Sequence, residues 1–259
     1  MGQVIAVTNQ KGGVGKTTTC INLGYSFSLL GRNTLLIDLD PQANCTSGVG
    51  VSDPEATVVD VFNGKPFPPI PIFDNLYLIP SSTDLLGIEV ELVNVSNREF
   101  ILRREIEPIK NKFDIILLDT PPSLGLLSVN ALTAADSCLV PVQAEYYALE
   151  GLASINRTIE FIQKTTNPDL AILGFVVTMF DNRTVLSKQV FDEIKRNFND
   201  LVFDIKIPRS VRVAEAPSFG KPLLQYDPTN LAGLAYLNLA DQLIQRLESR
   251  QLQKKASSS

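Results

Sequence analysis

The stretch Asn9–Cys20, N-Q-K-G-G-V-G-K-T-T-T-C, decides how the rest of this chain is interpreted. It follows an apolar run at 4–7 and precedes a segment with helical spacing, so it joins a predicted strand to a predicted helix. Its glycines allow a tight turn whose successive N–H groups point inward at the N-terminus of that helix. Unpaired donors and the helix dipole both favour an anion there. The stretch therefore predicts a site for the phosphates of a nucleoside triphosphate.

The residue types in this stretch match the phosphate-loop pattern G-x-x-x-x-G-K-[ST], with one departure. Lys16 supplies a positive charge for the β- and γ-phosphates, and the Thr17 hydroxyl is placed to bind Mg²⁺. At position 10 the first glycine is replaced by Gln10, and a second lysine, Lys11, follows. The predicted nucleotide-binding residues of the loop are Lys11, Gly12, Gly13, Val14, Gly15, Lys16, Thr17 and Thr18.

Composition limits the classes of protein to which this chain can belong. Its 259 residues are 44% hydrophobic, which suits one large α/β domain. It has no histidine, so mechanisms that need an imidazole base, such as the Ser-His-Asp triad, are excluded. Its three cysteines are widely spaced, which fits a reducing cytoplasm and excludes a cysteine-rich metal site. Neither a signal peptide nor an apolar run of about 18 residues is visible, so we expect no membrane span.

Charge is unevenly distributed along the chain. The net charge of −5 by itself argues against a general affinity for nucleic acid. Residues 1–182 hold 11 basic and 20 acidic side chains, whereas residues 183–259 hold 12 basic and 8 acidic ones. The C-terminal third is therefore predicted to contribute one basic face.

Apolar runs alternate with helical patterns from one end of the chain to the other. The predicted strands are 4–8, 34–38, 76–79, 115–119, 138–142, 172–179 and 202–207, and the predicted helices are 17–30, 97–111, 125–135, 148–164, 186–198 and 230–250. Continuous rather than alternating apolar runs are typical of parallel strands covered on both faces. The pattern predicts an α/β fold with a doubly wound, mostly parallel sheet flanked by helices, and with ligands at the carboxyl ends of the strands.

Two segments fall outside this alternation. Residues 52–75 contain Gly64 and four prolines between 66 and 71, which predict an irregular surface segment. Residues 254–259 are small and polar and are predicted to form a disordered tail. We therefore expect a single domain over residues 1–253.

Acidic residues end two of the predicted strands. The run L-L-I-D-L-D-P-Q at 35–42 places Asp38 and Asp40 at a strand end, on the same side if the strand stays extended. One of them is suited to orient or deprotonate a water that attacks the γ-phosphate. The alternative is that both aspartates cap the turn before Pro41. The run D-I-I-L-L-D-T-P-P at 114–122 similarly ends in Asp119, which is predicted to hold Mg²⁺ together with Thr17, unless it only caps a helix.

Together these motifs resemble those of the ParA/Soj branch of the deviant Walker A ATPases, a group that also contains MinD. The matching segments are K-G-G-V-G-K-T-T at 11–18, D-L-D-P-Q at 38–42, D-T-P-P-S at 119–123, Q-A-E-Y-Y-A-L-E-G-L at 143–152 and I-P-R-S-V-R-V-A-E-A-P-S-F-G-K-P at 207–222. The resemblance covers nearly the whole chain, and the last two segments are more specific to this branch than the phosphate loop is.

The resemblance implies a Mg²⁺-dependent ATPase that binds ATP and ADP and forms an ATP-dependent homodimer. It implies that Lys11 reaches across the dimer to the partner's nucleotide, much as an arginine finger does. Asp40 matches the aspartate needed for hydrolysis, and Asp119 matches the aspartate of the second nucleotide switch. The segment at Pro208 matches the one that lines the adenine, and Ser210 stands where the family often has Asn.

The same resemblance implies binding to double-stranded DNA without sequence preference. Arg183 and Arg212 match the family's DNA-contacting arginines, and Lys188 and Arg209 are further candidates in the same basic third. The implied partner is a ParB-type centromere-binding protein that stimulates hydrolysis, and the implied location is the cytoplasm, on the nucleoid. We find no motif for reading base edges.

Other functions use the same fold or chemistry. A MinD-like membrane-cycling ATPase carries a basic amphipathic helix at its C-terminus, whereas only Leu252 is strongly apolar after Leu247 here, so no stable membrane anchor is predicted. Positioning of a protein cargo would use the same residues and stays open. Small-molecule ligases of this fold generally lack the lysine at position 11, and iron–sulfur carriers need a close pair of cysteines.

Overall fold

The computed structural model describes residues 2–145 and 148–257, and it confirms the predicted alternation of strands and helices. Its strands are β1 (Gln3–Val7), β2 (Thr34–Asp38), β3 (Ile70–Phe73), β4 (Leu76–Ile79), β5 (Ile115–Asp119), β6 (Ser137–Gln143), β7 (Ala171–Phe180) and β8 (Val202–Pro208). Its α-helices are α1 (Lys16–Leu29), α2 (Asn44–Gly48), α3 (Val58–Phe62), α4 (Leu85–Glu91), α5 (Ile101–Ile106), α6 (Leu126–Ala134), α7 (Ala148–Thr165), α8 (Val185–Phe198), α9 (Arg212–Glu215), α10 (Leu223–Tyr226) and α11 (Leu231–Ser257). Short 3₁₀ turns are η1 (Leu92–Asn94), η2 (Arg98–Phe100), η3 (Lys110–Lys112), η4 (Asn199–Leu201) and η5 (Ala216–Phe219). Tyr146 and Tyr147 of the matching segment 143–152, and Ser258 and Ser259 of the predicted tail, lie outside the described residues.

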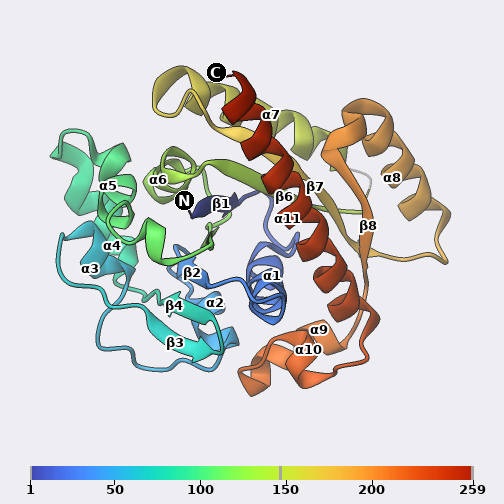
Figure 1. Cartoon of the computed structure of the whole chain (residues 1–259), viewed down its shortest axis with the longest axis horizontal. Coiled ribbons are helices and arrows are strands. Elements are labelled where there is room, and N and C mark those ends of the chain that lie inside the picture. The colour runs from blue at the N-terminus through green and yellow to red at the C-terminus, as the bar shows by residue number, and fades with distance from the viewer. Residues whose placement is uncertain (1, 146–147, 258–259) are drawn as a thin grey trace.

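The strands form one sheet in the order β3-β4-β2-β5-β1-β6-β7-β8 (Figure 1). Neighbouring strands are parallel except for β3 and β4, which pair antiparallel. Because β5 lies between β1 and β2, Asp119 is in register with both Val7 and Asp38. The loops that follow these three strands therefore meet at one edge of the sheet, as the sequence predicts.

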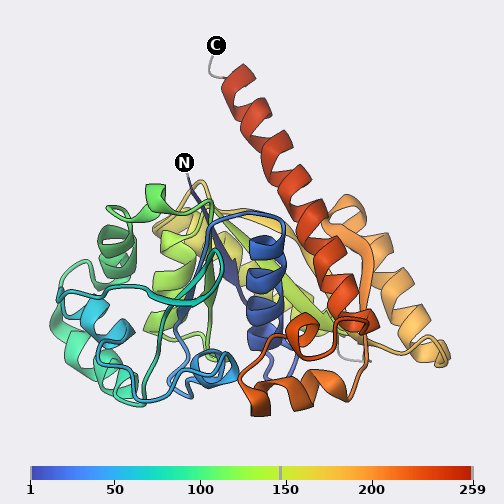
Figure 2. The same ribbon diagram turned by 60° about the horizontal axis from the view of Figure 1, so that its bottom comes forward.

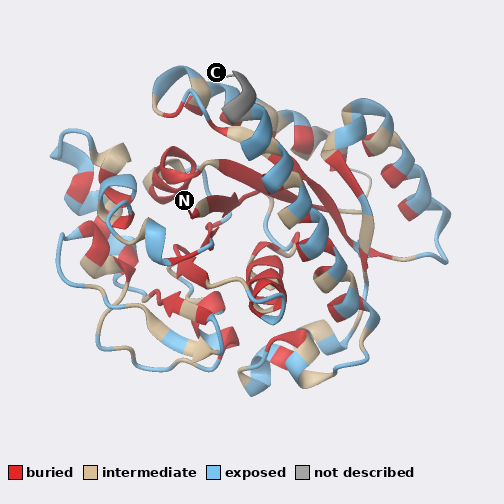
Figure 3. Ribbon diagram, in the orientation of Figure 1, coloured by how far each residue is buried: buried red, intermediate tan, exposed pale blue. Residues whose placement is uncertain are grey.

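Helices cover both faces of the sheet, so central strands such as β2 and β5 are buried on both sides, whereas the edge strands β3 and β8 are partly exposed (Figure 3). On one face α1 and α11 pack against the sheet, and Phe27 and Leu239 belong to the same buried cluster as Ile5 and Val7 of β1. On the other face the intervening residues of β1, such as Ala6, join a second cluster with residues of α3–α8. This double covering explains why the central strands have continuously apolar sequences.

The proline-rich segment is more regular than the sequence predicts. Within 52–75 the chain forms α3 and β3, so the expectation of irregular structure was wrong for those two elements. Thr57 starts α3 through a capping box, in which the Asp60 carboxylate accepts the Thr57 N–H at 2.9 Å. Strand β3 tolerates Pro71 because it lies at the edge of the sheet, where an amide donor can be lost without breaking the ladder.

Two helices differ in length from the prediction. The helix expected over 97–111 is reduced to α5, flanked by η2 and η3. Helix α11 instead continues to Ser257, so it includes residues 254–257 of the segment expected to be disordered. Gln, Lys and Ala are good helix formers, which fits this extension. The end of α11 projects past the rest of the chain (Figure 2).

Candidate active site

The phosphate loop joins β1 to α1 at the carboxyl edge of the sheet, as predicted. Gly13 and Gly15 have φ angles of 76° and 89°, a left-handed conformation that glycine adopts without strain. Helix α1 begins directly after Gly15. Among the described residues, no atom lies within 4 Å of a β-carbon built on Gly12 or Gly13. The loop is therefore an open cradle at a helix N-terminus, which is an anion-binding arrangement.

Lys16 is held at the centre of a charged cluster. Its side chain is 7% exposed, and its ammonium donates to the backbone oxygen of Lys11 at 3.4 Å. Burial lowers the pKa of Lys16, whereas the negative charges of Asp119 and Asp40 raise it. The structure thus brings together the lysine and the two acidic motifs that the sequence places far apart in the chain.

Asp38 has the contacts of a structural carboxylate. It accepts hydrogen bonds from the Asp40 N–H at 3.1 Å and from the Thr46 N–H and hydroxyl at 2.9 and 2.7 Å. Burial raises the pKa of Asp38 to about 6 in spite of these hydrogen bonds. Since these bonds involve both oxygens, Asp38 holds the turn from β2 to α2, and nothing in its contacts supports the predicted catalytic role.

Asp40 lies beyond the end of β2, so the parity argument for an extended strand does not apply to it. Its Oδ1 accepts the Gln42 N–H at 3.0 Å, and the side chain lines a cavity of about 380 Å³. The same cavity is lined by Gly12, Gly13, Gly15, Lys16, Thr17, Thr18, Gln42, Asn44, Pro122 and Met179. Asp40 is therefore the acidic residue that faces the space beside the phosphate cradle.

Asp119 is buried, and the protein compensates its charge only in part. It is 1% exposed, and neither of its carboxylate oxygens accepts a hydrogen bond from a described residue. Burial and the charge of Asp38 raise the pKa of Asp119 well above its ordinary value, whereas the neighbouring Thr17 side chain lowers it. A free carboxylate beside a hydroxyl is a donor set that fits Mg²⁺. These residues are suited to hold the ion, which would supply the positive charge that they lack.

A second cavity of about 310 Å³ adjoins the first, because both are lined by Thr17, Thr18 and Asn44. Its far side is formed by Val213, Ala216, Pro217, Lys221 and Leu223. The two cavities together offer room for a triphosphate and its nucleoside. Pro208 and Ser210, the residues predicted beside the adenine, line neither cavity, and the Ser210 hydroxyl instead accepts a hydrogen bond from Asn230 at 3.3 Å.

Sequence reasoning missed several of these lining residues. Val213, Pro217 and Lys221 lie within the quoted segment 207–222, so the motif located the right part of the chain but not its contacts. Met179 was missed altogether; it has a φ of 51°, a conformation that is uncommon for a residue other than glycine, and it borders the first cavity.

Comparisons with known proteins identify the family. A family model described as an AAA domain matches residues 2–172. Soj, the sporulation initiation inhibitor of Bacillus subtilis, is 48% identical over 94% of this chain and 98% of its own length. The chromosome partitioning protein ParA of Myxococcus xanthus is 45% identical over 95% of this chain and 89% of its own length. This chain belongs to the Soj/ParA family. It is a P-loop ATPase whose relatives are named chromosome partitioning proteins.

Solved structures agree with the fold of this chain, a mostly parallel P-loop sheet flanked by helices. The cobyrinic acid a,c-diamide synthase of Mycobacterium smegmatis, solved with an ATP analogue and magnesium, is 34% identical, with a TM-score of 0.84 over 96% of this chain and 97% of that one. The cell division ATPase MinD of Pyrococcus furiosus is 27% identical, with a TM-score of 0.79 over 95% of this chain and 100% of that one. Among the described residues, no helix is long and apolar enough to cross a membrane.

In this Soj/ParA-family chain, Lys11 turns away from its own phosphate cradle. Its ammonium forms an ion pair with Glu145, which follows β6, and its N–H donates to the Asn9 side chain at 3.0 Å. Lys11 does not line the cavity that contains Lys16 and Asp40. The two lysines of the loop therefore have different settings, and only Lys16 faces the space beside the cradle.

The four predicted DNA-binding residues of the Soj/ParA chain are exposed and follow two neighbouring strands. Arg183 and Lys188 come after β7, and Arg209 and Arg212 come after β8. The ends of these strands are joined, since the Arg209 N–H donates to the Phe180 oxygen at 3.0 Å. The structure thus collects these residues at the carboxyl edge of the sheet, which is also the edge of the phosphate loop.

Both arginines are paired with acidic residues in this conformation. The Arg183 guanidinium donates to the Asp181 carboxylate at 2.9 and 2.7 Å, and its side chain is 88% exposed. Arg212 donates to Glu215 at 2.6 Å. Hydrogen bonds from Arg183 lower the pKa of Asp181. Any phosphate that binds here must compete with these carboxylates.

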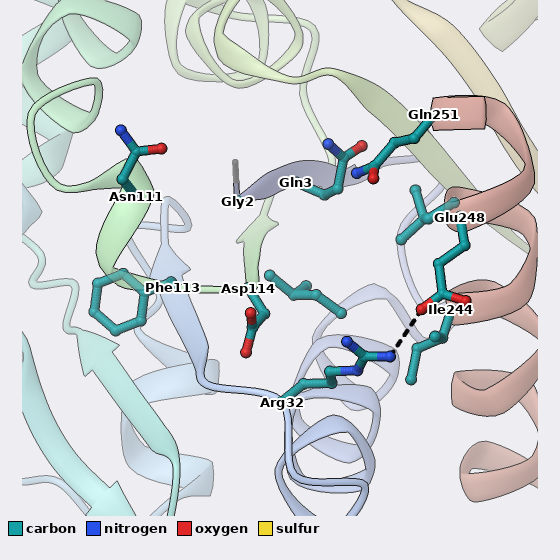
Figure 4. A pocket seen from close by; sticks show the side chains of 11 residues that line it. Gly2, Gln3, Arg32, Asn111, Phe113, Asp114, Ile244, Glu248 and Gln251 are labelled. Atoms are coloured by element: carbon teal, nitrogen blue, oxygen red, sulfur yellow. Dashed lines mark hydrogen bonds and ion pairs between the residues drawn. The ribbon is translucent and has the colours of Figure 1, made fainter. Parts of the chain in front are cut away.

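A further hollow of about 260 Å³ lies at the opposite edge of the sheet, between the start of β1 and the last turns of α11 (Figure 4). Arg32 and Glu248 form an ion pair across it at 2.9 Å. This hollow is not lined by the phosphate loop, by Asp40 or by Asp119. The cavities at the carboxyl edge of the sheet are therefore the better candidates for the nucleotide site.

Proposed function

We propose that this chain is an ATP-dependent dimerising, DNA-binding ATPase that segregates a chromosome or plasmid. One observation carries the proposal: the predicted DNA-binding side chains after β7 and β8 lie on the same sheet edge as the phosphate cradle. A change at the γ-phosphate can therefore alter the surface that meets DNA over a short distance. The family membership and the names of the relatives support the partitioning role.

In this proposal each residue of the site has a separate task. Gly12–Thr18 bind the phosphates of ATP, Lys16 neutralises them, and Asp40 orients the attacking water. Thr17 and Asp119 hold Mg²⁺, which supplies charge neutralisation when bound. Lys11 leaves Glu145 and contacts the nucleotide of a second copy, since the conformation described here directs it away from its own cradle.

DNA binding follows from dimerisation in this proposal. Arg183, Arg212, Lys188 and Arg209 contact phosphates without reading bases. One chain offers a modest patch, and a dimer doubles it, so affinity rises steeply with ATP and falls steeply with salt. A ParB-type partner stimulates hydrolysis, and after hydrolysis the dimer dissociates and releases DNA. We further propose a single domain over 1–253 that acts on the nucleoid in the cytoplasm.

The test is retention on non-specific double-stranded DNA, measured with ATP, with ADP and without nucleotide. We expect retention with ATP alone, lost as salt is raised. Equal retention in all three conditions would show that the nucleotide does not control the surface. No retention with ATP would remove DNA as the partner and would favour a membrane-cycling or metabolic ATPase.

A further inference from the structure

The departure from the usual phosphate-loop pattern at position 10 has a structural counterpart in α7. The Gln10 amide nitrogen donates to the Thr158 hydroxyl at 2.6 Å, and the Gln10 amide oxygen accepts from the Ser154 hydroxyl at 2.8 Å. Ser154 and Thr158 are one helical turn apart, so both face the loop from the same side of α7. One amide side chain is thereby bonded through both of its ends to one helix.

Helix α7 is a firm anchor for these bonds. Thr158 is 6% exposed, and its neighbours Ile155 and Ile159 are buried in the cluster that covers one face of the sheet. The Thr158 hydroxyl also donates to the Ser154 oxygen at 3.3 Å, which orients it toward the loop. A side chain bonded to such a helix has little freedom to move.

Residues 9–11 are all attached to the same part of the fold, which comprises β6, α7 and the segment between them. The Asn9 amide donates to the Pro141 oxygen of β6 at 2.8 Å and accepts the Lys11 N–H at 3.0 Å. The Lys11 ammonium pairs with Glu145 just before α7. Gly12 and Gly13, by contrast, have no neighbour that a β-carbon would meet among the described residues. The loop therefore has an anchored first half and an open second half.

We propose that Gln10 is a positioning residue that sets the direction of Lys11 by bonding the first half of the phosphate loop to α7. Glycine, the usual residue at this position, has no side chain with which to form this attachment. The inference rests on the proposed function, in which Lys11 acts on the nucleotide of a second copy. The proposal also gives α7 a role in the action of Lys11 on the second copy, because any shift of α7 moves the backbone on either side of Lys11.

Steady-state turnover and the affinity for a fluorescent ATP analogue, measured on the full chain, test this role. Gln10→Ala and Thr158→Val each remove the 2.6 Å hydrogen bond. We expect each to lower kcat about tenfold while the affinity for the analogue changes by less than about threefold, since the open half of the loop is intact. The double variant is expected to be no slower than Gln10→Ala, because both changes break one interaction.

Two controls separate this role from a general loss of structure. Thr158→Ser keeps the hydroxyl and is expected to restore the wild-type kcat. Thr165→Val removes an exposed hydroxyl that bonds only within α7, to the Phe161 oxygen, and is expected to leave kcat unchanged. Independent, multiplicative losses in the double variant would overturn the proposal, as would a loss of analogue affinity as large as the loss of kcat.

Lys11→Ala, measured beside these variants, distinguishes the two proposals. Wild-type turnover in Lys11→Ala would overturn the proposed function of Lys11. Loss of turnover in Lys11→Ala together with normal turnover in Gln10→Ala would leave that function intact and overturn the positioning role of Gln10.

Discussion

At the scale of single residues, the site depends on a contrast between two aspartates in register. Asp38 and Asp119 end neighbouring parallel strands, yet Asp38 accepts three well-formed hydrogen bonds, whereas only the Thr17 side chain and the Lys16 charge favour the ionised form of Asp119. A buried carboxylate without donors is costly when charged. When ionised, Asp119 therefore lowers the free energy of unfolding of the nucleotide-free protein, a cost that Mg²⁺ in the proposed site would relieve.

This cost predicts the pH dependence of stability. The folded-state pKa of Asp119 is raised, so between its ordinary and folded values the native state holds a proton that the unfolded chain has released. Stability should then fall as pH rises above about 4, and Asp38 adds a fall of the same sign that ends near its pKa of about 6. The thermal unfolding temperature, measured from about pH 4 to pH 8 in EDTA and without nucleotide, tests this dependence.

Asp119→Asn should unfold at a higher temperature than the wild type at about pH 8, and its advantage should shrink toward about pH 4. The same variant should lose the Mg²⁺ dependence of ATP binding. Asp192→Asn, which changes an exposed carboxylate on α8, is the control. Parallel stability curves for Asp119→Asn and the wild type would contradict the raised pKa of Asp119.

At the scale of elements, the packing of α11 and β8 against β7 leaves no room at Gly174. A β-carbon there would lie 2.4 Å from the Phe203 ring, 2.8 Å from the Leu201 oxygen and 2.8 Å from the Arg246 guanidinium. Arg246 also donates to the Leu173 oxygen at 2.8 Å, which attaches α11 to the sheet. Glycine at 174 is therefore required by close approach rather than by its backbone angles.

Gly174→Ala should lower the free energy of unfolding by about 2 kcal/mol or more, because two of the three neighbours are a ring and a backbone atom that cannot easily move. Gly151→Ala on α7 is the matched control, since no described atom lies within 4 Å of its β-carbon. Because Gly151 lies in the first turn of α7, that change should stabilise by up to about 0.5–1 kcal/mol. Denaturant unfolding of both variants without nucleotide tests both predicted changes in the free energy of unfolding. A Gly174→Ala protein as stable as the wild type would be incompatible with this packing.

Helices and strands could be predicted where the amino-acid pattern of the segment itself is distinctive. Strands β2, β4 and β5 have the predicted bounds, because buried parallel strands are continuously apolar. Strand β3 was missed because its prolines disfavour a strand everywhere except at an edge, and its edge position follows from pairing with β4. The short helices α2, α4, α9 and α10 were also missed, since helices of four to seven residues are too short to show a periodicity.

At the scale of the whole molecule, the proposed cycle requires ATP to hold two copies together until hydrolysis. Asp40→Ala removes the carboxylate that faces the cavity but leaves the phosphate loop and Lys11 unchanged. It should form an ATP-bound dimer with little turnover, seen by sedimentation and phosphate release. Ordinary hydrolysis in this variant would remove Asp40 from its proposed role.

The ion pairs at the basic edge predict opposite effects on DNA from two single changes. Glu215→Gln frees Arg212 from its partner and should tighten ATP-dependent DNA binding, whereas Arg212→Glu should weaken it without affecting ATP binding. The slope of log affinity against log salt should fall in magnitude by about one for each DNA phosphate that the protein no longer neutralises. Identical DNA affinity and salt slope in both variants would exclude Arg212 from the interface.

The sequence by itself determined the fold class, because apolar runs alternate with helical patterns along the whole chain. It also predicted the phosphate loop and the acidic positions Asp40 and Asp119, because each of these signals lies within one short segment. Only the tertiary structure decided that Asp38 holds a turn and that Arg183 and Arg212 are paired with carboxylates. It also decided that Gln10 bonds to Thr158, which lies 148 residues away in the chain. Such contacts depend on how strands align and how helices pack, and no local pattern encodes that arrangement.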